Sequence, residues 1–360
     1  SNLHQLLGSV ADALDGYDRA ARLFDELGNR RGEAMVLANS ASARHHLLGD
    51  DERAHADALR AMDHFTEIGD RAREAQCQEI LAGVAARAGH REEARRLLDA
   101  SLSGLAGTGN VVLEGQHLRS LALLHLEEGD LPAANQVLDH AERLAREAAL
   151  DELEVDLLSV RGLALLAAGE NESALTATRN AVAKLSPGVE RGYLIHHRHA
   201  LAAEAAGRID EARQAGRQAD DLLRATLAGL DAAQLRRALE TVPEHQAIVL
   251  TALRHAPHTV EVELPLADAP TGKTLERRHL RKVTWTVDHP DDGLIESPIE
   301  RRRARLARLL DEAHNEGVAP TTEHLADALA VSASTVRRDL DVLRQSGKHA
   351  ITRGHRKKVS

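Results

Sequence analysis

A glycine recurs about every 40 residues through the first two-thirds of the chain, and this period limits the possible folds more than any other feature. Successive glycines lie 38 to 41 residues apart, and a polar residue follows each of them. A fixed period of this length indicates an array of repeated structural units. The recurring glycines are Gly8, Gly49, Gly89, Gly129, Gly169 and Gly207.

Small residues keep a constant distance from these glycines. An alanine lies five residues after each, a second small residue lies seven further on, and another lies seven before each glycine after the first. The glycine would end one helix in a left-handed conformation, and the small residues would let the next helix approach closely. Since one helix pair cannot bury its apolar face alone, we expect the pairs to stack into a superhelix. The columns are Ala13, Ala54, Ala94, Ala134, Ala174 and Ala212; Ala20, Ala61, Ser101, Ala141, Ala181 and Ala219; and Ser42, Ala82, Ala122, Gly162 and Ala200.

The composition agrees with a helical array. Aromatic residues make up only 1% of the chain, so Leu, Ala, Val and Ile must build the core, and Ala and Leu favour helix. A second turn follows the second helix of each repeat. It is marked by Gly28, Gly69, Gly109 and the pair Pro187 and Gly188, whereas Ala149 breaks the pattern.

These columns resemble the tetratricopeptide repeat over about residues 3–229, although its usual aromatic positions are aliphatic here and its usual period is about 34 residues. The stretched repeats are similar to those of LuxR-family maltose-type activators and related signal-transduction ATPases. The resemblance implies a mainly α fold with a right-handed helical solenoid over residues 1–230. Because few residues precede Gly8, we expect a truncated first repeat, Ser1 and Asn2 as a cloning remnant, and the C-terminal part of a longer protein.

In this repeat class the first helix of each pair lines the concave side of the superhelix. Polar residues recur there at one phase, and one turn away lie Val36, Gln76, Gln116, Asp156 and Leu194. Such a ladder predicts a groove for a peptide or a partner helix. An ordinary solvated face is the alternative. The candidate groove residues are Asn39, Glu79, Arg119, Ser159 and His197.

Residues 231–298 lose the 40-residue period. Two further helices on either side of Pro243 are expected to cap the solenoid, and alternation over residues 259–265 and 281–288 predicts a small two-stranded linker element. Between the strands, residues 267–274 satisfy a relaxed phosphate-loop pattern. A nucleotide site is not expected, because Ala267 replaces the first glycine and no apolar helix follows Lys273.

Other catalytic or metal-binding patterns are weak. His196 and His199 lie three residues apart on an expected helix, but no third ligand has a recognised spacing. The lone Cys77 excludes an internal disulfide and is expected to fill the core. The sequence therefore predicts a chain that is not an enzyme, with no cofactor and no metal.

Residues 299–360 predict a winged helix-turn-helix. An amphipathic helix with Leu306, Leu309 and Leu310 comes first, and a short helix follows Thr321. The last helix should begin after Ser332, whose hydroxyl suits an N-cap, and the basic segment after Gly347 could form a wing. In this last helix Val336, Leu340 and Leu343 should be buried, and Ser334, Arg337, Arg338, Asp341 and Gln345 should face outward.

The last helix resembles the recognition helix of DeoR-type DNA-binding domains. The match comprises Val331, Ser332, Thr335, Val336, Arg337, Arg338, Asp339 and Leu340. In that family the domain is normally N-terminal and precedes a sugar-phosphate sensor, so its effector class does not carry over. The resemblance implies a helix in the major groove and a wing on phosphate. The implied DNA-binding residues are Ser332, Ser334, Thr335, Arg337, Arg338, Arg353, Arg356, Lys357 and Lys358.

Charge supports a polyanion partner at this end. Residues 271–360 carry a balance of +5, whereas the preceding 270 carry −15. We therefore predict a sequence-specific DNA-binding transcriptional regulator whose solenoid binds a protein or peptide, with a homodimer left open. The alternatives are a scaffold in which both parts bind proteins, or the sensor arm of a signal-transduction ATPase without its nucleotide domain. No apolar run approaches the ~20 residues of a membrane span and no signal peptide is evident, so we expect a cytoplasmic protein.

Overall fold

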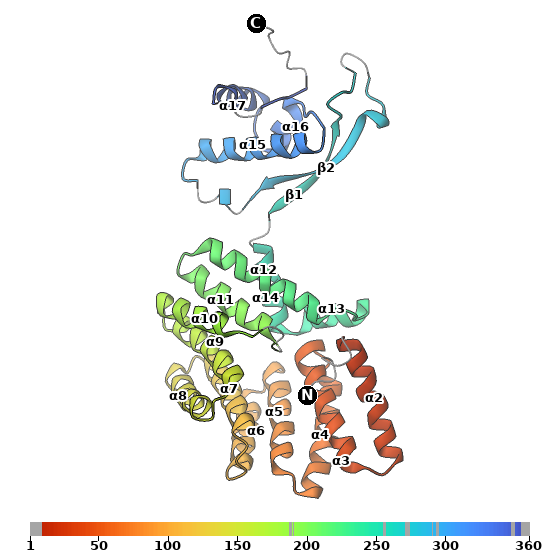
Figure 1. Ribbon diagram of the computed structural model, residues 1–360, viewed down its shortest axis with the longest axis vertical. Helices are drawn as coiled ribbons and strands as arrows, with labels where there is room; N and C mark the ends of the chain where they lie inside the picture. Colours follow the sequence, from red (N-terminus) through yellow and green to blue (C-terminus); the bar gives the residue numbers. More distant parts are fainter. Residues whose placement is uncertain are drawn as a thin grey trace. The chain divides into compact units, whose positions relative to one another are not determined.

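The structure is a computed structural model that describes residues 9–186, 189, 191–254, 257–270, 274–289, 291–292, 295–346 and 350–353. The chain divides into two compact units, residues 1–254 and residues 255–360, which are described separately below. Unit 1 is helical, and unit 2 combines a β-hairpin with further helices (Figure 1). Within the described residues, no helix has both the length and the apolar character that crossing a bilayer requires.

Unit 1 is the expected helical solenoid. Its inner helices are α3, α5, α7, α9 and α11, and each packs against the helix that follows it. The helices are α2 (Val10–Glu26), α3 (Arg30–Ala43), the π-helix η1 (Arg44–Leu48), α4 (Asp51–Ile68), α5 (Arg71–Arg87), α6 (Arg91–Leu105), α7 (Val111–Glu128), α8 (Leu131–Glu147), α9 (Asp151–Ala167), α10 (Asn171–Lys184), α11 (Gly192–Ala205), α12 (Ile209–Thr226), α13 (Ala232–Thr241) and α14 (Pro243–Arg254).

The columns of small residues form the contacts between paired helices. In the column five residues after the turn glycine, Ala54, Ala94, Ala134, Ala174 and Ala212 are all 0% exposed. The second column, seven residues further on, is equally buried from Ala61 onward. The third column, seven residues before each glycine, is buried from Ala82 of α5 onward. Larger side chains at these positions would force the paired helices apart, because protein interiors have little spare volume. The predicted repeat architecture is confirmed.

The turns between helices also follow the predicted period. The described glycines of both turn series have positive φ, from +63° at Gly49 to +83° at Gly89. Ala149, which breaks the glycine pattern, adopts φ +51°. The turn before α9 therefore has the same left-handed conformation as the others, although an alanine adopts it only with strain.

The last helices of unit 1 contact its first ones. Helix α13 packs against η1, and Arg237 forms an ion pair with Asp50 at 2.9 Å between Nη1 and Oδ2. Leu230, which precedes α13, packs against the cluster that contains Val10 of α2 and Leu47 of η1. The solenoid therefore curls until its two ends meet.

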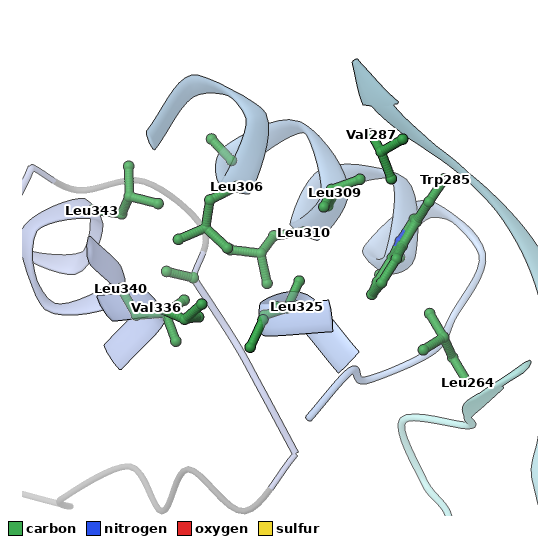
Figure 2. Packing of buried hydrophobic residues seen from close by; sticks show 14 of the residues in the cluster. Leu264, Trp285, Val287, Leu306, Leu309, Leu310, Leu325, Val336, Leu340 and Leu343 are labelled. Carbon is green, nitrogen blue, oxygen red and sulfur yellow. The ribbon is translucent and has the colours of Figure 1, made fainter. Parts of the chain in front are cut away.

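Unit 2 begins with an antiparallel hairpin of β1 (His258–Pro265) and β2 (Leu280–Asp288), with the 3₁₀ turn η2 (Arg277–His279) before β2. Helices α15 (Pro298–Asn315), α16 (Thr322–Ala328) and α17 (Ala333–Gln345) follow. Trp285 of β2, Leu309 of α15 and Leu340 of α17 belong to one hydrophobic cluster (Figure 2). The hairpin thus forms part of the core beneath the helix-turn-helix.

The middle segment differs in organisation from the expected linker of residues 231–298. Helices α13 and α14 lie in unit 1, as capping helices would, whereas the hairpin lies in unit 2. The hairpin is held there because its inward residues, including Val283 and Trp285, are buried against α15. Most of the expected wing lies outside the described residues, and residues 350–353 contain no strand.

Candidate nucleic-acid interface and solenoid pocket

Helix α17, the predicted recognition helix, is capped and oriented as its sequence predicts. The Ser332 hydroxyl accepts a hydrogen bond from the backbone N–H of Thr335 at 3.2 Å. This bond satisfies one of the N–H groups in the first turn that have no acceptor within the helix. Val336, Leu340 and Leu343 are at most 4% exposed and belong to the cluster formed with α15 and α16. One face of α17 is therefore fixed in the core.

The other face of α17 is open. Arg337 and Arg338 are exposed, together with Asp341. Arg337 lies 3.6 Å from Glu323 of α16, and both side chains are about two-thirds exposed. Such a loose pair leaves the guanidinium free to exchange partners.

The hydroxyl residues at the start of α17 form a small cluster. Ser334 and Thr335 each contact the Ser332 hydroxyl, at 2.8 and 2.9 Å. The predicted DNA-binding hydroxyls therefore lie together at the helix N-terminus, where backbone N–H groups also favour a phosphate.

The predicted wing residues are only partly covered by the structure. The backbone N–H of Arg353 donates to the carbonyl of Pro320 at 2.8 Å, and its guanidinium donates to the carbonyl of Pro270 at 2.5 Å. Arg353 therefore has internal partners in unit 2. Arg356, Lys357 and Lys358 lie outside the described residues.

Asp339 fixes the orientation of α17, a role that its sequence pattern did not indicate. Its carboxylate is 3% exposed and accepts hydrogen bonds from Nε of Arg302 at 2.6 Å and Nε of Arg303 at 3.1 Å, both on α15. Burial acts to raise the pKa of Asp339, but the two arginines outweigh it and leave that pKa below its usual value. The sequence signals were its place in the DeoR-type match and its position directly after Arg337 and Arg338, and neither indicates a buried anchor.

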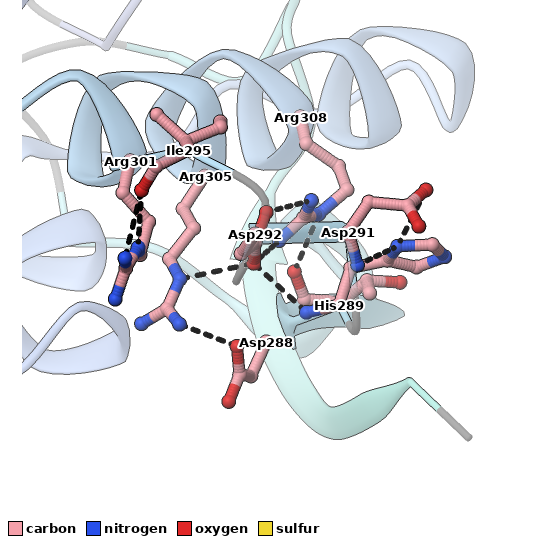
Figure 3. A network of polar contacts seen from close by, with 9 residues as sticks. Asp288, His289, Asp291, Asp292, Ile295, Arg301, Arg305 and Arg308 are labelled. Atoms are coloured by element: carbon pink, nitrogen blue, oxygen red, sulfur yellow. Dashed lines mark hydrogen bonds and ion pairs between the residues drawn. The ribbon is translucent and has the colours of Figure 1, made fainter. Parts of the chain in front are cut away.

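A second buried carboxylate holds the segment before α15. Arg305 and Arg308 reach from α15 to Asp292, with contacts of 2.9 and 2.7 Å to Oδ2 (Figure 3). Burial raises the pKa of Asp292, but the hydrogen bonds from Arg308 and the backbone of His289 lower it to about 2. Together with Arg302 and Arg303, these arginines of α15 are occupied within unit 2.

The candidate groove residues separate into two groups. Glu79 and Arg119 line a cavity of about 550 Å³ inside the solenoid, and Asn39 lines a neighbouring one of about 230 Å³. Ser159 is 0% exposed and accepts a hydrogen bond from Arg198 at 2.7 Å, and His197 is 7% exposed; neither lines these cavities.

Residues one turn away from the chosen phase also reach the interior. Gln76, Gln116 and Asp156 line the larger cavity. Arg191, which the repeat phase did not single out, lines both cavities. The polar lining of the solenoid interior is therefore broader than one helical phase.

The remaining motifs do not form sites in the described residues. The phosphate-loop-like segment joins β1 to β2, and the residues described after Lys273 lead through the short 3₁₀ helix η2 into β2 and not into an α-helix. Lys273 itself lies outside the described residues. His199 contacts Thr178 and Glu211, and no group of three metal-ligating side chains occurs in the part of the chain that the structure describes. Cys77 is buried, as predicted for a core residue.

Comparison with known proteins supports the assignment of both units. Residues 305–356 match the DeoR-like helix-turn-helix domain. The crystal structure of a Rap protein complexed with competence and sporulation factor aligns with a TM-score of 0.53 and 16% identity, covering 70% of each chain. BtubC from P. vanneervenii aligns with a TM-score of 0.46 and 17% identity, over 63% of this chain and 93% of that one. No curated protein matches the sequence. The C-terminal unit therefore contains a DeoR-like helix-turn-helix, and the first has a tetratricopeptide-like fold.

Proposed function

We propose that this chain is a DNA-binding transcriptional regulator in which α17 reads a specific duplex and the solenoid binds a protein or peptide. The observation that carries the proposal is the two-faced α17 within the DeoR-like domain. Its buried side is Val336, Leu340 and Leu343, and its open side presents Arg337 and Arg338. A helix fixed on one side with basic and hydroxyl side chains on the other suits the major groove.

The solenoid part of the proposal is supported by the inner cavities. They are lined by polar and charged side chains of several inner helices, as a binding surface requires. The aligned Rap protein was solved with competence and sporulation factor bound, and this supports a ligand role for the same fold here. We propose binding roles for both units, without catalysis.

The DNA-binding proposal is tested by selecting genomic fragments with the purified chain and measuring affinity for the enriched sequence. Arg337→Ala with Arg338→Ala should weaken specific binding by on the order of 1–3 kcal/mol for each base that an arginine no longer contacts. The matched control, Arg277→Ala with Arg278→Ala, removes the same charge from the exposed turn before β2 and should largely preserve the preference for the selected site.

A variant in the basic C-terminal segment separates positioning from sequence reading. Lys357→Ala with Lys358→Ala should weaken binding to all duplexes about equally and flatten its salt dependence, because phosphate contacts release counterions. Failure to bind any duplex at low salt refutes the proposal, and so does wild-type affinity in the Arg337 and Arg338 double variant.

A further inference from the structure

The two cavities of unit 1 adjoin, and both lie inside the ring of inner helices. The larger, about 550 Å³, is lined by residues from Ser42 near the start of the solenoid to Ile195 on α11. The smaller, about 230 Å³, shares His46 and Arg191 with it. A volume of several hundred Å³ suits a compact ligand. The two cavities together are called the chamber below.

The curl of the solenoid creates this chamber. One cavity can touch both α3 and α11 only because the first and last inner helices face each other across it. The contact of α13 with η1 and the Arg237–Asp50 ion pair hold the two ends together. The cavity therefore extends from the first inner helix to the last, where the two ends of the solenoid meet.

Most of the buried charge in the chamber is already compensated. Asp156 accepts hydrogen bonds from Arg119 at 2.6 Å and Arg198 at 2.8 Å. Glu79 accepts one from the Ser120 hydroxyl at 2.7 Å. Burial raises the pKa of Glu79, but His117 and Arg119 outweigh it and leave that pKa below its usual value. Two further acidic residues of the lining, at positions 151 and 152, are exposed at the start of α9.

Arg191 is the exception. Its guanidinium makes no hydrogen bond or ion pair with any residue that the structure describes, and its Nε is buried without an acceptor. Its backbone adopts φ +63°, a strained left-handed conformation that places the side chain just before α11. A partly buried guanidinium without an ion pair among the described residues, at the boundary of two cavities, can take an anion as its partner.

The charge of Arg191 acts on the pKa values of neighbouring groups. Burial, and then the charge of Arg191, hold the pKa of His46 well below its usual value. Arg191 also acts with Arg119 and Arg198 to lower the pKa of Asp156, against the effect of burial. Burial raises the pKa of Glu244, at the start of α14, but Arg191 and other groups outweigh it and leave that pKa below its usual value. No ion pair within 4 Å is described between Glu244 and Arg191.

We propose that the chamber binds a compact organic anion, with the Arg191 guanidinium paired to its carboxylate or phosphate group. Leu113, Leu153 and Leu194 provide an apolar wall for the rest of the molecule, and the larger cavity also carries the amide side chains of positions 76 and 116 for polar atoms. The proposal goes beyond the protein or peptide binding proposed above, because it gives the chamber a small ligand of its own. Arginine suits both anions, because its planar fork can donate two parallel hydrogen bonds.

The test uses three probes of equal chain length: hexanoate, hexyl phosphate and uncharged hexanol. Calorimetric titration of the full chain should show saturable binding of at least one anion and none of hexanol at the same concentration. The stronger of the two anions identifies the group that the chamber accepts. Absence of saturable anion binding at millimolar concentration, or equal binding of hexanol, overturns the proposal.

Arg191→Gly is the sharpest variant, because glycine adopts positive φ without strain while the guanidinium is removed. It should keep the melting temperature of unit 1 and reduce anion affinity at least tenfold. Arg191→Lys keeps the charge and should retain much of the binding, and Arg96→Ala, which removes an exposed arginine of α6, is the control and should bind as the wild type does. Wild-type affinity in Arg191→Gly would refute the assignment.

DNA binding is measured on the same preparations without a probe. Arg191→Gly should leave it unchanged, because Arg191 lies in unit 1. A chain that binds its duplex but no anion would refute the anion site alone. A chain that binds the anion but no duplex would refute the regulator and leave the anion site standing.

Discussion

Asp339→Asn should loosen the attachment of α17 to α15 without changing the exposed face of α17. The substitution keeps the size of a 3% exposed side chain but removes the charge that Arg302 and Arg303 share. A charge-assisted hydrogen bond contributes about 1.5–3 kcal/mol, and a fully buried ion pair costs about 3–5 kcal/mol when one partner is removed. Because the two arginine side chains are 27% and 28% exposed, water can partly solvate them. We expect a loss of about 2–3 kcal/mol in the free energy of unfolding of unit 2.

The assay follows from Trp285, the sole tryptophan of the chain, which is 0% exposed in the core of unit 2. Its fluorescence reports the unfolding of this unit within the intact protein. At about 1.5 kcal/mol per molar urea, the expected loss moves the midpoint by roughly 1–2 M. Asp341→Asn is the matched control, since Asp341 is exposed and pairs with Arg344 on the same helix, and it should change stability by about 0.5 kcal/mol or less.

The effect must also depend on pH. The folded pKa of Asp339 is lowered, so its contribution is complete above the unfolded value of about 3.9 and is lost as pH falls through the folded pKa. The difference between wild type and Asp339→Asn should therefore shrink in acid. Equal midpoints at pH 7 for the Asp339 and Asp341 variants would refute the anchoring role.

Two further predictions concern the turns and the unit boundary. Ala149→Gly should raise the free energy of unfolding of unit 1 by about 0.5–1 kcal/mol, followed by helical circular dichroism in urea, because it relieves φ +51°. Ala148→Gly, at φ −93°, should lower it, and the same sign for both would contradict the turn conformation. A fragment of residues 1–298 keeps the hairpin but lacks α15 beyond its first residue, so its Trp285 emission should shift to the red as the side chain becomes exposed to solvent. A fragment of residues 255–360 should keep the blue-shifted emission of a buried tryptophan. Native-like emission from residues 1–298 would show that the hairpin does not need α15.

The solenoid could be predicted because close contacts between paired helices restrict the size of the residues at regularly spaced positions. A position where two helix backbones approach closely admits only small residues, and the buried columns through Ala94 and Ser101 are examples. The turn at Ala149 could not be predicted in the same way. There the two flanking helices impose a left-handed backbone conformation, and Ala149 adopts it although alanine does not favour it.

The inner face could be predicted only in part, because choosing the same helical position in every repeat assumes that all repeats present that position to the interior. Glu79 and Arg119 do line the chamber, but Ser159 is covered by Arg198 from the next inner helix. Arg191 lies in the turn before α11, outside the helical phase used to choose candidates. Closure of the ring depends on contacts between residues some 200 positions apart, which no local pattern records.

The arginines of unit 2 show why charge alone overstates a nucleic-acid surface. Sequence counting treats the arginines of α15 as equal to those of α17, yet Arg302 and Arg303 hold Asp339, and Arg305 and Arg308 hold Asp292. Carboxylates that are at most 3% exposed bind these guanidinium groups, so phosphate would have to break existing ion pairs to recruit them. Arg337 and Arg338 have no such buried partner among the described residues. Under the proposed function, we therefore expect the exposed face of α17 to determine specificity, while the ion pairs of Arg302 and Arg303 with Asp339 hold α17 against α15.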